Sequence, residues 1–142
     1  MKLSEAIRLG AMIRPKADGW FFLDGASCAQ GAALEACGTP YDDDFTAQLN
    51  FHFTVQLLWP WAGQREACCP VCDRQQSVKG IIAHLNNRSG HSWTREAIAD
   101  WVATVEPADP VVATSLDGDS QRSSVDAVDP VLTNSRGGST RA

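Results

Sequence analysis

Apolar residues near the N-terminus recur at helical spacing. The stretch between Leu3 and Ile13 predicts a short first helix, with Ser4 near its start and Pro15 just beyond its end, where a helix cannot continue. Gly10 weakens this prediction, because a glycine inside a helix costs about 1 kcal/mol relative to alanine.

A second helix is predicted in the alanine-rich stretch that Ser27 opens. It runs over residues 28–36 and is closed by Gly38 and Pro40. Its small residues suit close packing against a neighbour. Cys28 and Cys37 are interpreted as small buried hydrophobic residues in or beside this helix. A role for them as additional metal ligands is the alternative.

The pattern of residues 41–61 admits two interpretations. Three aspartates crowd its start, as a helix N-terminus prefers, so we expect a helix that begins near Asp43. The apolar residues at i, i+4 and i+8 are Phe45, Leu49 and Phe53. However, apolar and polar residues also alternate over 51–57, which is the period of a strand. An extended segment before Pro60 therefore remains the alternative.

The last helix is predicted from Thr94, which can cap a helix that begins at Arg95. The apolar face of this helix is formed by Ile98, Trp101, Val102 and Val105. This spacing is typical of a helix packed on a core through one face. Arg95, Glu96 and Asp100 are expected on the solvent side, and the helix should end at Glu106 and Pro107.

Two cysteines and two histidines have the spacing C-x2-C-x11-H-x6-H. They are Cys69, Cys72, His84 and His91. Structural Zn²⁺ takes four nitrogen or sulfur ligands in a tetrahedron, and cysteines two residues apart can converge on one ion from a tight turn. The gap between the histidines exceeds the roughly 3–5 residues of common Cys2His2 fingers. We therefore expect His84 on a helix over 79–85 and His91 after a loop, just before the last helix.

Other interpretations of these residues stay open. Cys68 could replace Cys69 as a ligand, or the site could be two buried thiols and two surface histidines. A redox dithiol is disfavoured, because the βαβ context of a thioredoxin-like motif is absent. A zinc hydrolase would need an open coordination position and a general base, for which the nearby carboxylates are Glu66, Asp73 and Glu96. His84-Leu85-Asn86 weakly resembles part of the motif of HNH-type nucleases.

The composition changes after residue 106. Residues 107–142 contain no aromatic residue, cysteine or histidine and are rich in Gly, Ser, Thr, Asp and Pro. Such a stretch cannot bury enough surface to offset its chain entropy, which predicts a disordered tail. We expect a small, mainly α, zinc-stabilised domain over 1–106. Its CxxC knuckle, with the helices that follow it, lies at 65–106, and one short strand pair is compatible with this pattern.

The net charge of the whole chain and the net charge of residues 65–95 have opposite signs, so the charge of this segment is the more informative one for binding. The chain of 142 residues has 17 acidic and 12 basic side chains, a net charge of −5. Between residues 65 and 95, however, five basic residues face two acidic ones, a local charge of +3. The candidate phosphate contacts in this segment are Arg74, Lys79, Arg88 and Arg95. Together with Trp59, Trp61 and Trp93 they are compatible with nucleic-acid binding, although a solvated face and core aromatic residues explain the same pattern.

Neither a secretory signal nor an apolar membrane span is visible, so we expect a reducing cytoplasm and no membrane partner. In that compartment clustered cysteines usually bind metal. The odd total of five cysteines is then not a disulfide framework.

Several runs of the chain resemble small uncharacterised zinc-finger-like proteins encoded by phages and prophages. The runs lie at 3–12, 27–29 and 31–36, then at the Cys-Pro-Val-Cys knuckle, 84–86, His91, 93–96 and 98–102. The loop from Asn87 to Gly90 is longer than in that pattern, and the tail is not covered. The resemblance implies a phage or prophage origin and a site of action in the host cytoplasm. It implies no established activity.

The sequence therefore predicts a non-catalytic accessory or regulatory protein that holds Zn²⁺ and binds a macromolecule. The macromolecule is either a nucleic acid or a host protein that the chain inhibits or recruits. A zinc-dependent hydrolase or nuclease is the third hypothesis. The partner and the oligomeric state do not follow from the sequence.

Overall fold

The computed structural model describes residues 1–39 and 43–109, which contain six helices and two antiparallel strand pairs. The helices are α1 (Leu3–Ala11), α2 (Ala29–Ala36), α3 (Asp44–Leu58), α4 (Pro60–Gln64), α5 (Val78–Asn86) and α6 (Arg95–Val105). The strands are β1 (Phe22–Leu23), β2 (Ala26–Ser27), β3 (Glu66–Cys68) and β4 (Gln75–Ser77). The helix-rich fold is confirmed, with two short strand pairs in place of the one that was allowed for.

Side-chain caps set the starts of most helices. The side chain of Asp43 accepts a hydrogen bond from the backbone N–H of Thr46, and Thr94 accepts one from Ala97. Ser77 accepts one from Gly80 in the same way. Each cap satisfies a backbone donor that the first helical turn leaves without a partner. Of the two interpretations of residues 41–61, the helix is confirmed, since α3 runs unbroken to Leu58.

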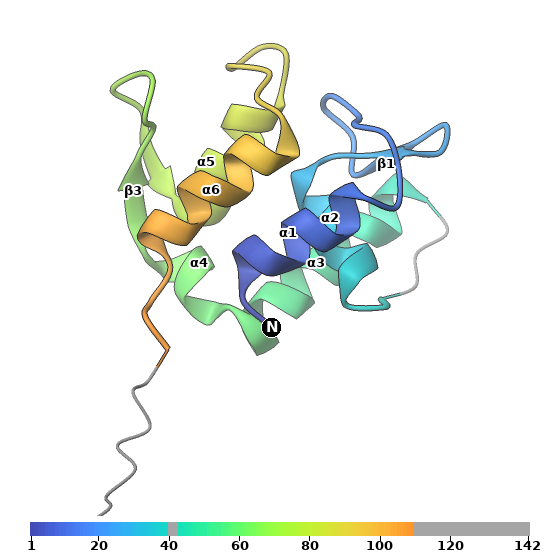
Figure 1. Ribbon diagram of the computed structural model, residues 1–142, viewed down its shortest axis with the longest axis horizontal. Helices are drawn as coiled ribbons and strands as arrows, with labels where there is room; N and C mark the ends of the chain where they lie inside the picture. Colours follow the sequence, from blue (N-terminus) through green and yellow to red (C-terminus); the bar gives the residue numbers. More distant parts are fainter. Residues whose placement is uncertain (40–42, 110–142) are drawn as a thin grey trace, which may run out of the picture. The chain divides into compact units, whose positions relative to one another are not determined.

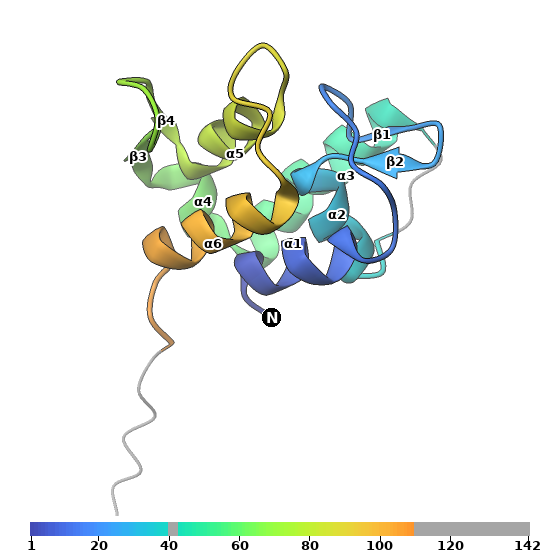
Figure 2. The ribbon, with the colours of Figure 1, turned by 45° about the horizontal axis from the view of Figure 1, so that its top comes forward.

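A single apolar core joins the helices. α1 packs most extensively on α2 and on α6, α2 packs on α3, and α5 contacts α2, α4 and α6 (Figures 1 and 2). The large, fully buried apolar side chains include Leu3, Ile7, Leu34, Phe51, Ile81, Ile82, Leu85 and Ile98. Trp59 is also buried, at 2% exposure, as the interpretation of this tryptophan as a core residue predicts.

Gly10 is explained by the contact between α1 and α2. A Cβ at this position would lie 1.8 Å from the carbonyl oxygen of Ala32, so only glycine allows the two helices to approach this closely. The small residues of α2 serve the same close packing. Gly10 thus lowers the intrinsic stability of α1 as a helix but allows closer packing between α1 and α2.

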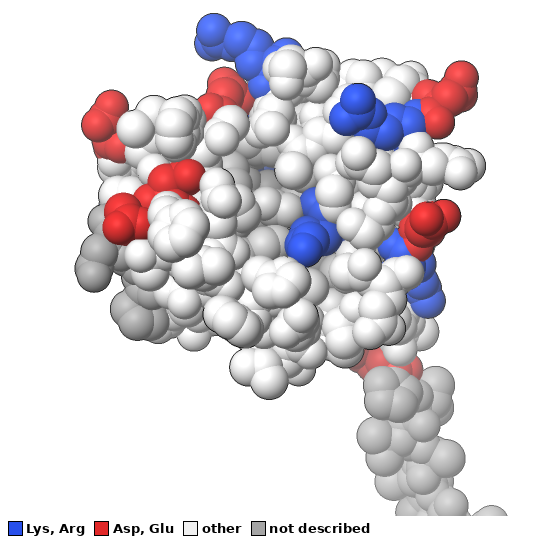
Figure 3. Space-filling view, turned by 180° about the vertical axis from the view of Figure 1, so that it is seen from behind, with Lys and Arg blue, Asp and Glu red and all other residues white. Residues whose placement is uncertain are grey.

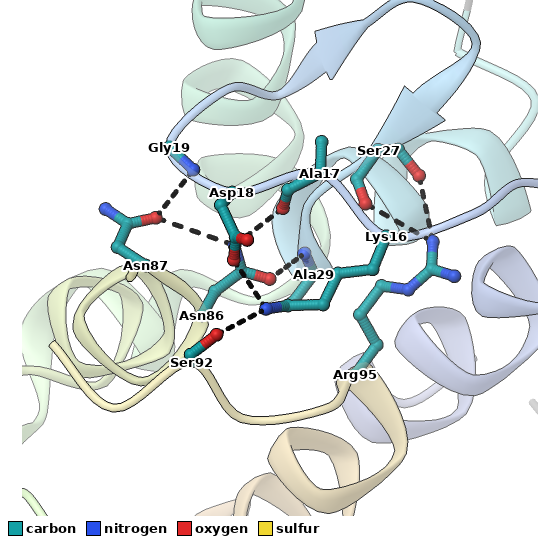
Figure 4. A network of polar contacts seen from close by, with 10 residues as sticks. All are labelled: Lys16, Ala17, Asp18, Gly19, Ser27, Ala29, Asn86, Asn87, Ser92 and Arg95. Carbon is teal, nitrogen blue, oxygen red and sulfur yellow. Dashed lines mark hydrogen bonds and ion pairs between the residues drawn. The ribbon is translucent and has the colours of Figure 1, made fainter. Parts of the chain in front are cut away.

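The start of α6 overturns one expectation. Arg95 is not on the solvent side: it is only 5% exposed and its guanidinium points into the loop that precedes α2. It donates hydrogen bonds to Ser27, both to the carbonyl oxygen at 3.3 Å and to the hydroxyl at 3.2 Å (Figure 4). It also donates to the carbonyls of Ala11 and Arg14. Four acceptors for one guanidinium offset much of the cost of burying its charge.

Asn86 makes a second connection between the two halves of the chain. Its side-chain oxygen accepts from the N–H of Ala29 at 3.1 Å, and its side-chain nitrogen donates to the carbonyl of Ala17 at 3.0 Å (Figure 4). Asn87 adds a bond from the N–H of Gly19. The end of α5 is therefore held to the N-terminal loop by side-chain amides.

The stretch 107–142, predicted as a disordered tail, lies outside the described residues apart from its first three. Within residues 1–39 and 43–109, none of the helices combines the length and the hydropathy that a membrane crossing requires.

Candidate metal centre

The two cysteines of the motif lie on the loop of the β3–β4 hairpin. Cys68 pairs with Gln75 at the end of the strands, and the N–H of Cys69 donates to the carbonyl of Arg74 at 2.8 Å. The loop from Cys69 to Arg74 is thereby closed into a tight turn. Inside it the N–H of Val71 points at the Cys69 sulfur, 3.4 Å away. This is the knuckle that the spacing of the two cysteines predicts.

The two histidines come from the other side of the site. His84 lies near the end of α5, and His91 follows the loop that leads to α6. The loop folds back on itself, because the carbonyl of Asn87 accepts from both Gly90, at 2.9 Å, and Ser92, at 3.1 Å. The entry of His84 from a helix and of His91 after a loop is as predicted.

Gly90 allows the α5–α6 loop to fold back against α5. In the sequence, only its position just before His91 points to this role. A Cβ at Gly90 would lie 1.8 Å from the carbonyl oxygen of His84 and 3.0 Å from its Nδ1. Any other residue would push the loop away from α5. The imidazoles of His84 and His91 instead meet edge to face, with ring centroids 4.7 Å apart.

Cys69, Cys72, His84 and His91 converge as one group. The four ligand atoms, one from each side chain, lie within 4.8 Å of one another, and Cys72 Sγ lies 3.4 Å from His84 Nε2. An ion with zinc's bond lengths would space tetrahedral ligand atoms by roughly 3.3–3.8 Å. The group is therefore close to the dimensions of a four-coordinate site and could hold a metal ion.

His91 gives an independent sign that the group is suited to a metal. Its Nε2 is buried and has no hydrogen-bond partner among the residues that the structure describes. A buried polar atom without a partner is costly, and it commonly marks the place of a ligand or ion. A metal bound by this nitrogen together with the two sulfur atoms would satisfy it.

The electrostatics of the site favour the metal-binding forms of two ligands. Burial acts to raise the pKa of the Cys69 thiol, but the N–H groups of Val71 and Cys72, the Cys72 side chain and the charge of Arg74 outweigh it and lower that pKa. Burial, with Arg74 and His91, lowers the pKa of His84. A thiolate and a neutral imidazole are the forms that bind zinc.

The remaining cysteines lie outside this group. Cys68 is exposed and its sulfur accepts a hydrogen bond from the Gln75 side chain at 3.3 Å. Cys28 is buried, caps α2 through the N–H of Gly31, and has a pKa raised to about 11 by burial. Cys37, predicted to be buried as well, is half-buried at the C-terminal end of α2 and packs against the core. The interpretation of Cys28 as a core thiol is confirmed.

The four candidate phosphate contacts differ in their exposure and in the element that carries them. Arg74 and Arg88 are exposed on two loops that carry three of the four candidate ligands, the knuckle and the α5–α6 loop. Lys79 is half-buried on α5 and borders a hollow beside α3. Arg95 is buried in the hydrogen bonds described above, so its expected contact with a phosphate is wrong.

The candidate general bases do not join the metal group. Among the described residues, the group that could hold an ion contains two thiols and two imidazoles and no carboxylate. Glu66, Asp73 and Glu96 all lie outside it. The group thus consists of four sulfur and nitrogen donors.

Comparison with known proteins adds no further assignment, because no family model, curated protein or solved structure matches this chain.

The close approach at Gly90 can be tested against a matched glycine. Gly90→Ala should weaken metal binding by this group more than tenfold, because the new methyl group would collide with His84 and separate the histidines. Gly63→Ala, on α4, should leave metal binding unchanged, since its Cβ would be 3.8 Å from the nearest atom. Competition with a zinc-binding dye measures both affinities. Equal affinities for the two variants would contradict this role of Gly90.

Proposed function

We propose that Cys69, Cys72, His84 and His91 hold one Zn²⁺ in a structural site. The observation that supports this most strongly is the convergence on one point of two sulfur and two nitrogen donors, a set that structural zinc takes. Two thiolates neutralise the ion, so the site needs no further counter-charge. The ion would link the β3–β4 hairpin to the end of α5 and the loop before α6.

The proposed role of the zinc is not catalytic. Four protein ligands fill a tetrahedral ion, whereas a hydrolytic zinc keeps a position for water or substrate. No carboxylate of the described residues belongs to the group. A general base would therefore have neither a bound water to activate nor a place at the ion.

We further propose that the zinc site presents a surface to a macromolecule, with nucleic acid as the first candidate. The knuckle and the α5–α6 loop both project from the same side of the molecule (Figure 1). Each carries one exposed arginine, Arg74 and Arg88. Guanidinium groups on two loops fixed by one ion are suited to neighbouring phosphates.

A protein partner is the second candidate, and a different observation favours it. Large apolar side chains of α3, such as Phe45 and Leu57, are exposed at 68% and 80%. Exposed apolar patches of this kind commonly bind proteins. An accessory or regulatory role of the phage or prophage type, in a host cytoplasm, rests on the resemblance alone.

The zinc proposal predicts a difference between two neighbouring cysteines. The purified full chain should contain about one zinc per chain, and Cys72→Ala should abolish stoichiometric zinc and lower the free energy of unfolding by several kcal/mol. Cys68→Ala should change neither, because Cys68 is outside the group. Metal analysis and urea unfolding measure both. A wild-type chain that contains no zinc, and whose free energy of unfolding Cys72→Ala leaves unchanged, would refute the proposal.

The nucleic-acid version predicts a salt-dependent interaction with oligonucleotides. Replacing both Arg74 and Arg88 by Ala should weaken binding and reduce the salt slope by about 2, because each arginine would otherwise neutralise one phosphate. Arg8→Ala, which removes an exposed arginine from α1, is the matched control. Fluorescence anisotropy with single-stranded and duplex DNA measures the affinities. Absence of binding, or binding that the double variant and salt leave unchanged, would reject nucleic acid and favour the protein partner.

A further inference from the structure

The outer face of α3 is apolar without a covering element in the described residues. The exposed large side chains on this face are Phe45 (68%), Leu49 (45%), Phe53 (58%) and Leu57 (80%). We call these four residues the α3 stripe. The opposite face of the same helix, with Ala47, Phe51 and Val55, packs into the core. A helix that is apolar on both sides is normally buried on both sides.

Charge does not oppose a partner at this face. Asp44 is the only charged residue in the 15 residues of α3, and its carboxylate is already engaged by the N–H of Phe21 at 2.6 Å. Figure 3 views the molecule from the side opposite to Figure 1 and shows broad uncharged areas between separate charged side chains, one of them a Lys or Arg near the middle of the view. A basic or acidic partner would therefore find little to pair with on the stripe, whereas an equally uncharged one would fit.

We propose that the occupant is a second copy of this chain, with the two α3 helices packed antiparallel about a two-fold axis. The four members of the stripe have the spacing i, i+4, i+8 and i+12, which forms one ridge along the helix. A ridge of this kind can pack into the groove of a neighbouring helix. The neighbouring row of α3, with His52 and Gln56, borders hollows that provide the groove beside the ridge.

The order of side chains along the stripe favours the antiparallel arrangement. With Leu49 opposite Phe53 of the other copy, Phe45 comes opposite Leu57. Each phenylalanine then meets a leucine, whereas a parallel pair would set phenylalanine against phenylalanine. The two copies of Asp44 would also lie at opposite ends, about 20 Å apart at 1.5 Å per residue. Self-complementarity of this kind is what a two-fold interface requires.

The area of the stripe is sufficient for such a dimer. With about 200 Å² for the full surface of a large apolar side chain, the exposed fractions of the four residues amount to roughly 500 Å² in each copy. Two copies would bury about 1,000 Å², the lower limit for a biological interface. The dimer does not depend on the metal or on the proposed binding surface, so its test is separate from theirs.

Light scattering and sedimentation equilibrium of the purified full chain test the proposal. Wild type should be a dimer that dissociates on dilution, and Leu57→Glu should raise the dimer dissociation constant by about tenfold or more. Met12→Glu is the matched control, because Met12 is similarly exposed, at 78%, but lies at the end of α1. It should leave the dimer intact. Circular dichroism and urea unfolding verify that each variant folds.

A charge exchange tests the antiparallel register. Phe45→Lys and Leu57→Glu should each be monomeric alone and form a heterodimer when mixed, since position 45 of one copy faces position 57 of the other. A wild-type chain that stays monomeric, a dimer that Leu57→Glu leaves unchanged, or a mixture that stays monomeric would overturn the proposal. So would a monomer that instead binds phosphatidylcholine vesicles through the stripe, since the occupant would then be a lipid surface.

Discussion

The convergence of four ligand side chains on one point is the constraint on which the second half of the molecule depends. The β3–β4 hairpin has strands of three residues, and most of its residues are exposed. Such a hairpin buries too little apolar surface to be stable alone. The loop between α5 and α6 is equally short of core residues. An ion shared by Cys69, Cys72, His84 and His91 would fix both segments at once, as structural zinc does in small domains with limited cores.

The N-terminal half is tied to the same place by polar side chains rather than by the metal. Asn86 follows His84 by two residues, and Arg95 follows His91 by four. Both reach into the residue 16–29 loop and satisfy its backbone groups (Figure 4). The candidate ligands are thus flanked by the buried hydrogen bonds that join the two halves. Because breaking any of these bonds would leave a buried polar group without a partner, they position the ligands more strictly than apolar packing alone would.

The helix starts and the set of converging side chains could be predicted from the sequence, because both depend on local chemistry. Asp43 and Thr94 are short polar side chains at the point where a helix begins, and the spacing of the two cysteines and two histidines fits one ion. The burial of Arg95 could not be predicted, because its acceptors at Ser27 and Ala11 are far away along the chain. The sequence also could not predict which face of α3 packs on the core, because the helix is apolar on both sides. Strands of two or three residues are too short to show a period.

A closed coordination shell is the central claim, and X-ray absorption at the zinc edge of the purified full chain tests it most directly. The predicted shell contains two sulfur atoms at about 2.3 Å and two nitrogen atoms at about 2.0–2.1 Å, with no bound water. A shell with an oxygen ligand in place of one histidine, with a third sulfur atom, or with no protein ligands would contradict it.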